Sequence, residues 1–341
     1  MNIAPRALAP QSFTSMFQPM TSSWHLIRIL CASLVVAACH APSAEPDPRG
    51  TVTEAAVRRE LSALADDSME GRGTATAGGA RAARFIAAEL ERAGVAPAGD
   101  SGYFQRVPTD RGLAVNVIGI VRGSSPTRRD SAVVVAAHYD HLGIGRPVGG
   151  DSIYNGADDD ASGVVTVLQV ARALAHSQPE RTLIFLLTTG EEVGLLGTRR
   201  YLEAPTVPLD RTVAELEVEM IGRPDSLAGG PGRAWLTGYE RSTMGDMLKA
   251  AGSPIVPDPR PDQHFFERSD NIAFARRGIP AHTLSSFNLH EDYHTPADEV
   301  SRVDFPHMTA VIQAAVAAVR ELAGGPAPVW KPGGRPTAGG R

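Results

Sequence analysis

The segment Thr182-Leu-Ile-Phe-Leu-Leu-Thr-Thr-Gly-Glu191-Glu192-Val-Gly-Leu-Leu-Gly197 joins a continuous apolar run to a helical pattern. Apolar residues without alternation are typical of a strand that is buried on both faces of its sheet. Adjacent side chains diverge, so one of the two carboxylates can bind a metal ion while the other faces its bound water. Because ligands bind beyond the carboxyl ends of strands in open α/β sheets, the segment predicts a buried strand that leads into a chemical site.

The alternation of apolar runs with helical patterns continues on both sides of this segment. Strands are expected at 114–121, 132–137, 182–188, 213–221 and 279–285. Helices are expected at 53–66, 79–93, 161–175, 192–202, 241–251, 270–277 and 298–322. This order predicts an α/β fold with a mixed, largely parallel central sheet and helices on both faces.

The composition is that of a globular protein. The chain has 341 residues, of which 43% are hydrophobic and 21% are charged, and its formal net charge is −5. This balance excludes a mainly disordered chain and a membrane protein with many spans. No basic stripe is visible, so nucleic acid is not expected as a partner.

The N-terminal residues have the pattern of an export signal. The apolar run from Leu26 to Cys39 is too short to span a bilayer but fits the core of a signal peptide. It ends in Val36-Ala-Ala-Cys39, which resembles a bacterial lipobox. We therefore expect residues 1–38 to be a lipoprotein-type signal peptide, and the exported protein to be held by a lipid on Cys39 at the periplasmic side of a bacterial membrane. The alternative is an ordinary secretory signal and a secreted protein.

The rest of the chain is expected to form one domain. Residues 39–50 are expected to be a linker, residues 51–322 a single catalytic domain, and residues 323–341, which are rich in Gly and Pro, a disordered tail. Both cysteines, Cys31 and Cys39, precede the domain. Any metal ion bound by the domain must therefore be held by histidines and carboxylates.

Histidines and acids also gather near the ends of other expected strands. The first cluster is His138-Tyr-Asp140-His141, where a His can ligate a metal while a nearby carboxylate fixes its tautomer. The second is Asn155-Gly-Ala-Asp158-Asp-Asp160-Ala-Ser-Gly163. Its three acids would repel one another unless a cation or a helix N-terminus offsets their charge. A helix cap alone explains the second cluster, and so does Asp158 on a metal with Asp160 or Ser162 as the cap.

Two further clusters complete the set. Glu215, Glu217 and Glu219 share one face of an expected strand because side chains alternate along it. Glu219 lies nearest the carboxyl end and is the candidate ligand, with Glu217 as the second choice. The last cluster, His290-Glu-Asp-Tyr-His294, precedes the final helix.

Taken in order, these clusters resemble the co-catalytic zinc aminopeptidases and carboxypeptidases of metallopeptidase family 28. The matching motifs are His138-x-Asp140, Gly156-Ala-Asp-Asp-Asp-Ala-Ser-Gly163, Gly190-Glu-Glu-x-Gly-Leu-x-Gly197, Glu219-Met-Ile-Gly-Arg223 and Tyr293-His-Thr-Pro-Ala-Asp298. Met69-Glu-Gly-Arg-Gly-Thr74 and Arg268-Ser-Asp-Asn271 also match, so the resemblance spans roughly residues 54–322. It implies the zinc-exopeptidase (phosphorylase/hydrolase-like) form of the α/β fold and two Zn²⁺ ions as cofactors.

The resemblance also implies which residues bind the metal ions. Asp158 would bridge the two zinc ions, with His138 and Glu219 completing one site. Glu192 and His294 would complete the other. The family usually has Asp where this chain has Glu219, which carries the same charge on a side chain one methylene longer.

Three more residues would act in catalysis. Glu191 would be the general base that takes a proton from a water bridging the zinc ions. Tyr293 would hydrogen-bond the carbonyl oxygen of the substrate, and Asp140 would orient His138. The sequence departs from the family at Asn271, where His is common.

The expected function is that of a zinc-dependent exopeptidase, most simply an aminopeptidase acting on the N-terminus of a peptide or protein. Carboxypeptidase and dipeptidase activity stay open, because the sequence does not define the substrate. One alternative is a single-zinc enzyme like glutaminyl-peptide cyclotransferase, which commonly has Trp where this chain has Tyr293. Another is a binding protein without activity, which the intact pair Glu191 and Glu192 disfavours.

Overall fold

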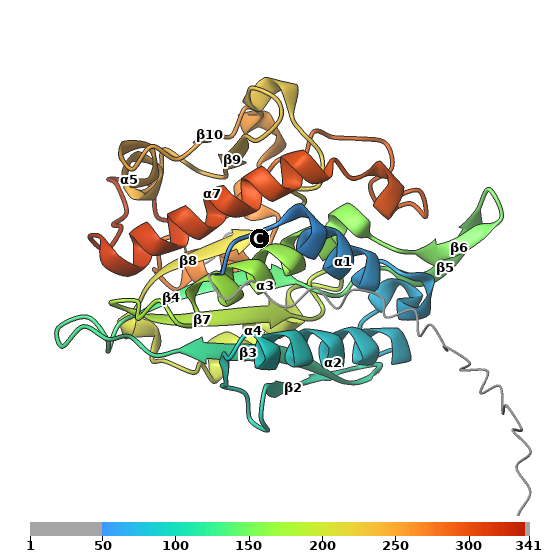
Figure 1. Ribbon diagram of the computed structural model, residues 1–341, viewed down its shortest axis with the longest axis horizontal. Coiled ribbons are helices and arrows are strands. Elements are labelled where there is room, and N and C mark those ends of the chain that lie inside the picture. The colour runs from blue at the N-terminus through green and yellow to red at the C-terminus, as the bar shows by residue number, and fades with distance from the viewer. Residues whose placement is uncertain (1–49, 338–341) are drawn as a thin grey trace, which may run out of the picture. The chain divides into compact units, whose positions relative to one another are not determined.

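A nine-stranded sheet forms the centre of the computed structural model, which describes residues 50–337 (Figure 1). The strands are β1 (Ala96–Pro97), β2 (Phe104–Thr109), β3 (Gly112–Val121), β4 (Ala132–His138), β7 (Thr182–Thr188), β8 (Thr212–Val218), β9 (Ala234–Leu236), β10 (Ile255–Pro257) and β11 (Ala281–Ser285). Their order is β1-β3-β7-β4-β8-β11-β9-β10, with β2 also paired to β3.

The four strands in the middle of the sheet, β7, β4, β8 and β11, run parallel to one another. Antiparallel pairs occur between β3 and β7 and between β9 and β11. His138 pairs with Thr188, so the carboxyl ends of β4 and β7 lie at the same edge of the sheet. The prediction of a mixed, largely parallel α/β sheet is confirmed.

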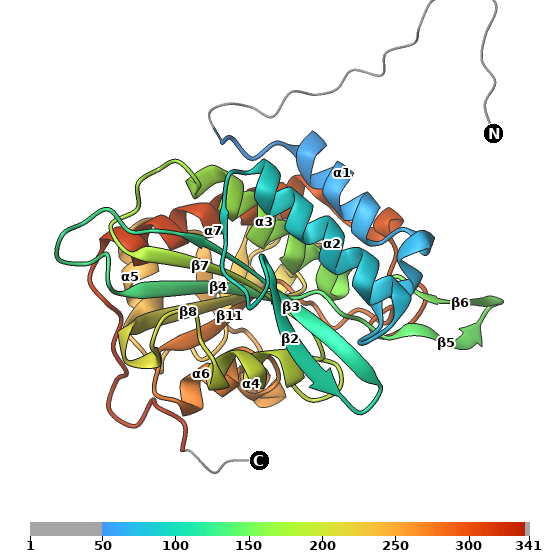
Figure 2. The same ribbon diagram turned by 90° about the horizontal axis from the view of Figure 1, so that it is seen from below.

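Helices cover both faces of the sheet (Figure 2). One layer contains α1 (Glu54–Leu64), α2 (Ala77–Arg92), α3 (Gly163–Leu174) and α7 (Phe305–Gly324), and the other contains α4 (Leu196–Glu203) and α6 (Asn271–Arg276). The short helix α5 (Met244–Ala250) packs beside β10 and α7.

The sequence of β4 shows why its apolar run is continuous. Val133 and Val135 belong to the core beneath the first helix layer, whereas Val134 and Ala136 belong to the core beneath the second. All four side chains are fully buried. Each face of the strand therefore requires apolar side chains, and the usual alternation with polar residues is lost.

The sequence did not predict the hairpin formed by β5 (Gly143–Val148) and β6 (Asp151–Tyr154). It projects from the body of the protein on the side where the central strands end (Figures 1 and 2). Its strands are mostly exposed or half-buried, so neither carries the apolar pattern of a core strand.

The structure corrects the expected C-terminal boundary. Helix α7 continues to Gly324, and residues 325–337 pack on the domain rather than forming a disordered tail. The indole nitrogen of Trp330 donates to the carbonyl of Gly278 at 2.9 Å, and Trp330 forms a β-bridge with Ser242. Lys331 adds an ion pair with Asp246 at 2.7 Å, so several contacts hold a segment whose Gly and Pro content suggested disorder.

The expected signal peptide and the site of the lipid lie outside the described residues and stay predictions. The residues of the expected linker, apart from Gly50, also lie outside them. Within residues 50–337, which belong to one compact unit, no helix has the length and apolar character needed to cross a membrane.

Arg72 connects the N-terminal layer to the loops that follow the central strands. Its side chain is fully buried. The guanidinium donates to five backbone carbonyls, at distances of 2.6 to 3.5 Å, and these belong to Leu64, Tyr139, Asn155, Gly156 and Asp159. Only arginine carries five N–H donors in a rigid plane, so no other residue can satisfy the same set.

We predict that Arg72→Met destabilises the fold strongly. The substitution leaves buried carbonyls without donors, and such losses typically cost about 3–5 kcal/mol in the free energy of unfolding. Urea denaturation of the purified protein measures this change. Arg84→Met, at an exposed position of α2, is the matched control and should change stability by less than about 0.5 kcal/mol. Equal stability of the two variants would contradict the role of Arg72.

Candidate metal centre

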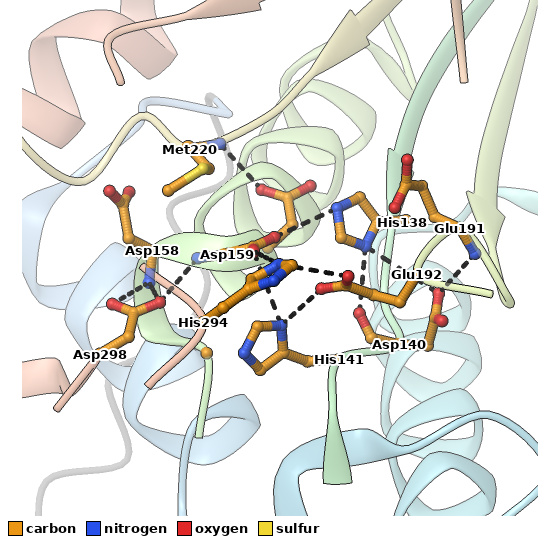
Figure 3. A network of polar contacts seen from close by, with 12 residues as sticks. His138, Asp140, His141, Asp158, Asp159, Glu191, Glu192, Met220, His294 and Asp298 are labelled. Carbon is orange, nitrogen blue, oxygen red and sulfur yellow. Dashed lines mark hydrogen bonds and ion pairs between the residues drawn. The ribbon is translucent and has the colours of Figure 1, made fainter. Parts of the chain in front are cut away.

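The carboxyl ends of three neighbouring strands supply most of the polar side chains of the site. His138 is the last residue of β4, Glu191 and Glu192 follow β7, and Glu219 comes directly after β8. His294 reaches the same place from the loop that precedes α7 (Figure 3). The parallel arrangement of the strands brings these residues together although they are far apart in the sequence.

Two groups of side chains have ligand atoms within 4.8 Å of one another. The first group is His138, Asp159 and Glu219, and the second is His141, Asp159, Glu192 and His294. Asp159 belongs to both. Its Oδ1 lies 3.3 Å from His138 Nε2, and its Oδ2 lies 3.1 Å from His294 Nε2. The two oxygens of this carboxylate therefore face different groups, which is the arrangement of a bridging ligand.

The donor atoms fit a pair of zinc ions. Imidazole nitrogen and carboxylate oxygen are zinc ligands in sites that lack thiolates. The Nε2 atom of His138 is buried, faces Asp159 and has no hydrogen-bond partner among the described residues, so this nitrogen is free to bind a metal ion. Divalent cations would also offset the repulsion among the buried carboxylates.

The structure corrects the expectation for Asp158, which lies in neither group. Its Oδ1 accepts a hydrogen bond from the backbone nitrogen of Gly222 at 2.6 Å, and its Oδ2 lies 3.0 Å from Nε2 of His290. The next residue, Asp159, has an extended backbone (φ −105°, ψ 100°) inside an irregular turn, and its carboxylate points into the site instead.

The three consecutive acids thus have three different roles. Asp160 Oδ1 accepts from the backbone nitrogens of Gly163 and Met220, which caps the start of α3 as one reading of the sequence predicted. The carboxylate of Asp298 accepts from the backbone nitrogens of both Asp158 and Asp159 at 3.0 to 3.1 Å. This distant residue holds the turn in the conformation that aims Asp159 at the metal groups.

Asp140 orients His138, but through its backbone rather than its carboxylate. The Nδ1 atom of His138 lies 3.0 Å from the carbonyl oxygen of Asp140 and 3.9 Å from its carboxylate. A proton on Nδ1 leaves Nε2 with the lone pair that faces Asp159. The Asp140 carboxylate instead accepts from the Thr74 hydroxyl at 2.7 Å and from the Glu191 backbone nitrogen at 3.2 Å.

His141 is a site residue to which the sequence analysis assigned no role. Its ring is fully buried, and its Nδ1 lies 2.9 Å from Glu192 Oε1. This contact holds the Glu192 carboxylate so that Oε2 faces His294 Nε2 at 3.2 Å. A second histidine three residues after His138, on the same loop, was the only signal for it in the sequence.

Burial and contacts between the charged groups shift the pKa values of the site residues. Burial by itself would raise the pKa of Glu192, but hydrogen bonds with His141 and His294 lower it to about 2. Burial would lower the pKa of His294, but its contacts with Asp159 and Glu192 raise it to about 10. Burial raises the pKa of Glu219 to about 7, against the attraction of His138.

Glu217, the second choice for the ligand on β8, is not part of either metal group. It is fully buried, and neither carboxylate oxygen has a hydrogen-bond partner among the described residues. Burial raises its pKa well above the usual value.

Glu191 differs from the metal groups in its environment. The network in Figure 3 includes Glu191 only through its backbone nitrogen, and its carboxylate lines a pocket beside the metal groups. Burial raises the pKa of this carboxyl well above its usual value, and the negative charges of Glu219 and Asp270 add to the effect. A free carboxylate with a raised pKa beside the pocket has the properties of a general base.

The pocket is lined by both polar and aromatic side chains. The metal groups form one part of its wall, and Trp235, Phe265 and Phe287 form another. Tyr293 also lines it, with its ring stacked on that of His294 at 3.9 Å between centroids. The pocket can therefore hold an apolar group next to the metal centre.

Comparison with protein-family models matches residues 116–319, more than half of the chain, to Peptidase family M28. A curated relative from Trichophyton verrucosum named "Probable leucine aminopeptidase" is 29% identical over 224 residues, covering 61% of this chain and 57% of the relative. A "Vacuolar membrane protease" from Botryotinia fuckeliana is 27% identical over 213 residues, covering 60% of this chain. The chain spans only 18% of that protease's length.

Solved structures share the fold. The aminopeptidase from Aneurinibacillus sp. strain AM-1 superposes with a TM-score of 0.64 at 15% identity, covering 82% of this chain and 96% of that one. BSAP, a zinc aminopeptidase from Bacillus subtilis, superposes with a TM-score of 0.62 at 15% identity, covering 80% and 96%. At these identities the likeness shows a common fold.

We predict that Asp159→Asn abolishes stable zinc binding whereas Asp158→Asn preserves it. Removing a residue that only supports a ligand typically weakens metal binding about 10–100-fold, and loss of the shared ligand should exceed that range. Zinc content after dialysis, measured by atomic absorption, distinguishes the variants. Asp158→Asn is the matched control because an amide oxygen can still accept from Gly222. Zinc loss in Asp158→Asn with retention in Asp159→Asn would reverse the assignment.

Proposed function

Because the chain belongs to peptidase family M28, we propose that it is a zinc-dependent exopeptidase, and within that class an aminopeptidase that removes N-terminal residues from peptides. The observation that carries the proposal is the carboxylate of Asp159, shared by two groups of imidazole and carboxylate ligands beside the free carboxylate of Glu191. This set provides two metal sites and a base next to one pocket.

The metal groups support an assignment of the ligands. His138 and Glu219 would hold one zinc ion, Glu192 and His294 the other, and Asp159 would bridge them. When bound, the zinc ions would polarise the scissile carbonyl and lower the pKa of water to near neutrality.

Glu191 then transfers the proton from the water to the leaving group. Glu191 takes a proton from the attacking water and delivers it to the leaving amine, so that the amine departs in neutral form. Its backbone is held by the Asp140 carboxylate, which is itself hydrogen-bonded to Thr74. The base therefore occupies a defined position, which general base catalysis requires.

Tyr293 has the position and chemistry to stabilise the developing oxyanion. It lines the pocket beside His294, and burial raises the pKa of its phenol. The phenol therefore stays protonated and can donate a hydrogen bond to the carbonyl oxygen as negative charge develops there.

Aminopeptidase activity is preferred over the alternatives for two reasons. The curated relative with the higher coverage of its own length carries an aminopeptidase name, and two metal groups rather than one argue against a single-zinc cyclotransferase. This chain covers only part of the length of each of these relatives, so their names do not define its substrate. The substrate is therefore inferred from the site.

We predict that Glu191→Gln keeps zinc but lowers kcat/KM by roughly 10²–10⁴-fold or more, because the amide cannot accept the proton. Release of nitroaniline from a panel of aminoacyl-nitroanilides measures activity, before and after chelation and return of zinc. Glu203→Gln, at an exposed position of α4, is the matched control and should retain activity.

Two outcomes would contradict the proposal. An active Glu191→Gln enzyme would exclude Glu191 as the base. A wild-type protein that is zinc-loaded but cleaves no member of the panel would contradict aminopeptidase activity and favour carboxypeptidase, dipeptidase or cyclotransferase chemistry.

We also propose that the enzyme acts after export, held to a membrane by a lipid on Cys39. The support is the apolar run from Leu26 to Cys39 and its lipobox-like end. We expect Cys39→Ser, which removes the only lipid attachment site of this motif, to shift the protein from the membrane to the soluble fraction. Continued sedimentation of the variant with membranes would contradict the anchor.

A further inference from the structure

The pocket carries one cation that the proposed chemistry does not use. Arg268 is the only lysine or arginine among the described residues that line it. Its guanidinium carbon lies 5.0 Å from the centroid of the Phe265 ring, within the range of a cation–π contact. Phe265 is in turn stacked on Trp235, with 5.2 Å between centroids. The guanidinium therefore covers the end of the aromatic wall.

The position of Arg268 is well defined although its side chain is exposed. Its backbone nitrogen donates to the carbonyl of Phe265 at 3.1 Å. The next two residues, Ser269 and Asp270, are buried, and Asp270 accepts from the Thr188 hydroxyl at 2.6 Å. Arg268 thus extends from a fixed segment of the pocket wall rather than from a free loop.

No carboxylate of the described residues forms an ion pair with Arg268. Other arginines in this part of the fold are paired: Arg223 with Asp292 at 2.7 Å, Arg241 with Glu267 at 3.1 Å, and Arg260 with Asp225. Its side chain lines the pocket, and its guanidinium lies against the Phe265 ring of the pocket wall. Its positive charge is therefore available to a ligand.

The metal centre does not remove this charge. The pocket contains four carboxylates, on Asp159, Glu191, Glu192 and Glu219, and two divalent ions would carry an equal and opposite charge. Arg268 would then be an uncompensated positive charge in a pocket that also accepts apolar groups. A guanidinium can bind a carboxylate through two parallel hydrogen bonds.

We propose that Arg268 is a specificity residue that binds a carboxylate of the peptide substrate. The inference rests on the proposed function, since carboxylates are the anionic groups of unmodified peptides. Two sources share this chemistry: an acidic side chain on the N-terminal residue, and the free C-terminal carboxylate of a dipeptide.

The test compares substrates that differ only in this charge. Glutamyl- and glutaminyl-nitroanilide form one pair, and Leu-Leu and Leu-Leu-amide form the other. We expect the wild-type enzyme to prefer the carboxylate member of one pair, which identifies the source. In Arg268→Gln this preference should fall by about tenfold or more, mainly through KM, because a charge-assisted hydrogen bond is lost.

Two further variants separate a specific role from a structural one. Arg268→Lys should retain part of the preference, because the charge remains while the two-pronged geometry is lost. Arg84→Gln, at an exposed position of α2 outside the pocket lining, is the matched control and should keep the wild-type preference. An unchanged preference in Arg268→Gln, or no preference in the wild type for either pair, would overturn the inference.

A binding measurement makes the result independent of turnover. Glutamate, glutamine and the two dipeptides are titrated into the zinc-supplemented protein by calorimetry. Tighter binding of a carboxylate ligand that weakens in Arg268→Gln supports the inference even if none of the substrates is cleaved, in which case the proposed function alone fails. Equal binding by the wild type and Arg268→Gln would overturn the inference even if the enzyme is active.

Discussion

The buried guanidinium of Arg72 is the interaction on which the site depends. It ties the carbonyl of Leu64, the last residue of α1, to the loop that follows β4 and to the turn that precedes α3. His141 and Asp159 lie on these two loops, and His138 directly precedes the first of them, so one side chain connects the segments that carry members of both metal groups. Thr74, two residues further along, continues the support by donating to Asp140. The first helix layer therefore helps to build the metal centre as well as to cover the sheet.

The second constraint is the separation of tasks among adjacent acids. In the turn before α3, the carboxylate of Asp160 caps the helix and that of Asp158 accepts from the loop after β8. The carboxylate of Asp159 faces the metal groups. After β7, Glu192 contacts two histidines while the side chain of Glu191 remains free beside the pocket. In both places, consecutive side chains diverge because each is engaged by a different partner. As a result, the site contains carboxylates that are held by protein contacts and one free carboxylate, that of Glu191, beside the pocket.

The pocket then combines two electrostatic environments. Its metal side is rich in carboxylates, whose charges would be offset by divalent ions. Its aromatic side ends at Arg268, whose charge has no protein counter-ion among the described residues. An aromatic wall excludes water and so strengthens polar interactions near it. Substrate selection and bond cleavage can thus be controlled by different charges within one cavity.

The sequence by itself determined the fold class and most of the candidate site. Buried strands such as β4 and β7 need apolar residues on both faces, a requirement that is visible in the local pattern. His138, Glu192 and Glu219 could be selected because polar residues at the carboxyl ends of such strands meet at one edge, whereas His294 was selected through the family resemblance. Tertiary structure decided the rest. The choice of Asp159 over Asp158 depends on the Asp298 carboxylate, which accepts from the backbone nitrogen of Asp159, and on the backbone nitrogen of Gly222, which donates to Asp158. The role of His141 depends on its contact with Glu192. Residues 325–337 join the fold through contacts that include those of Trp330 and Lys331. The physical reason is that periodicity specifies a helix or a strand from neighbouring residues, whereas the direction of a side chain in an irregular turn is set by partners distant in the sequence.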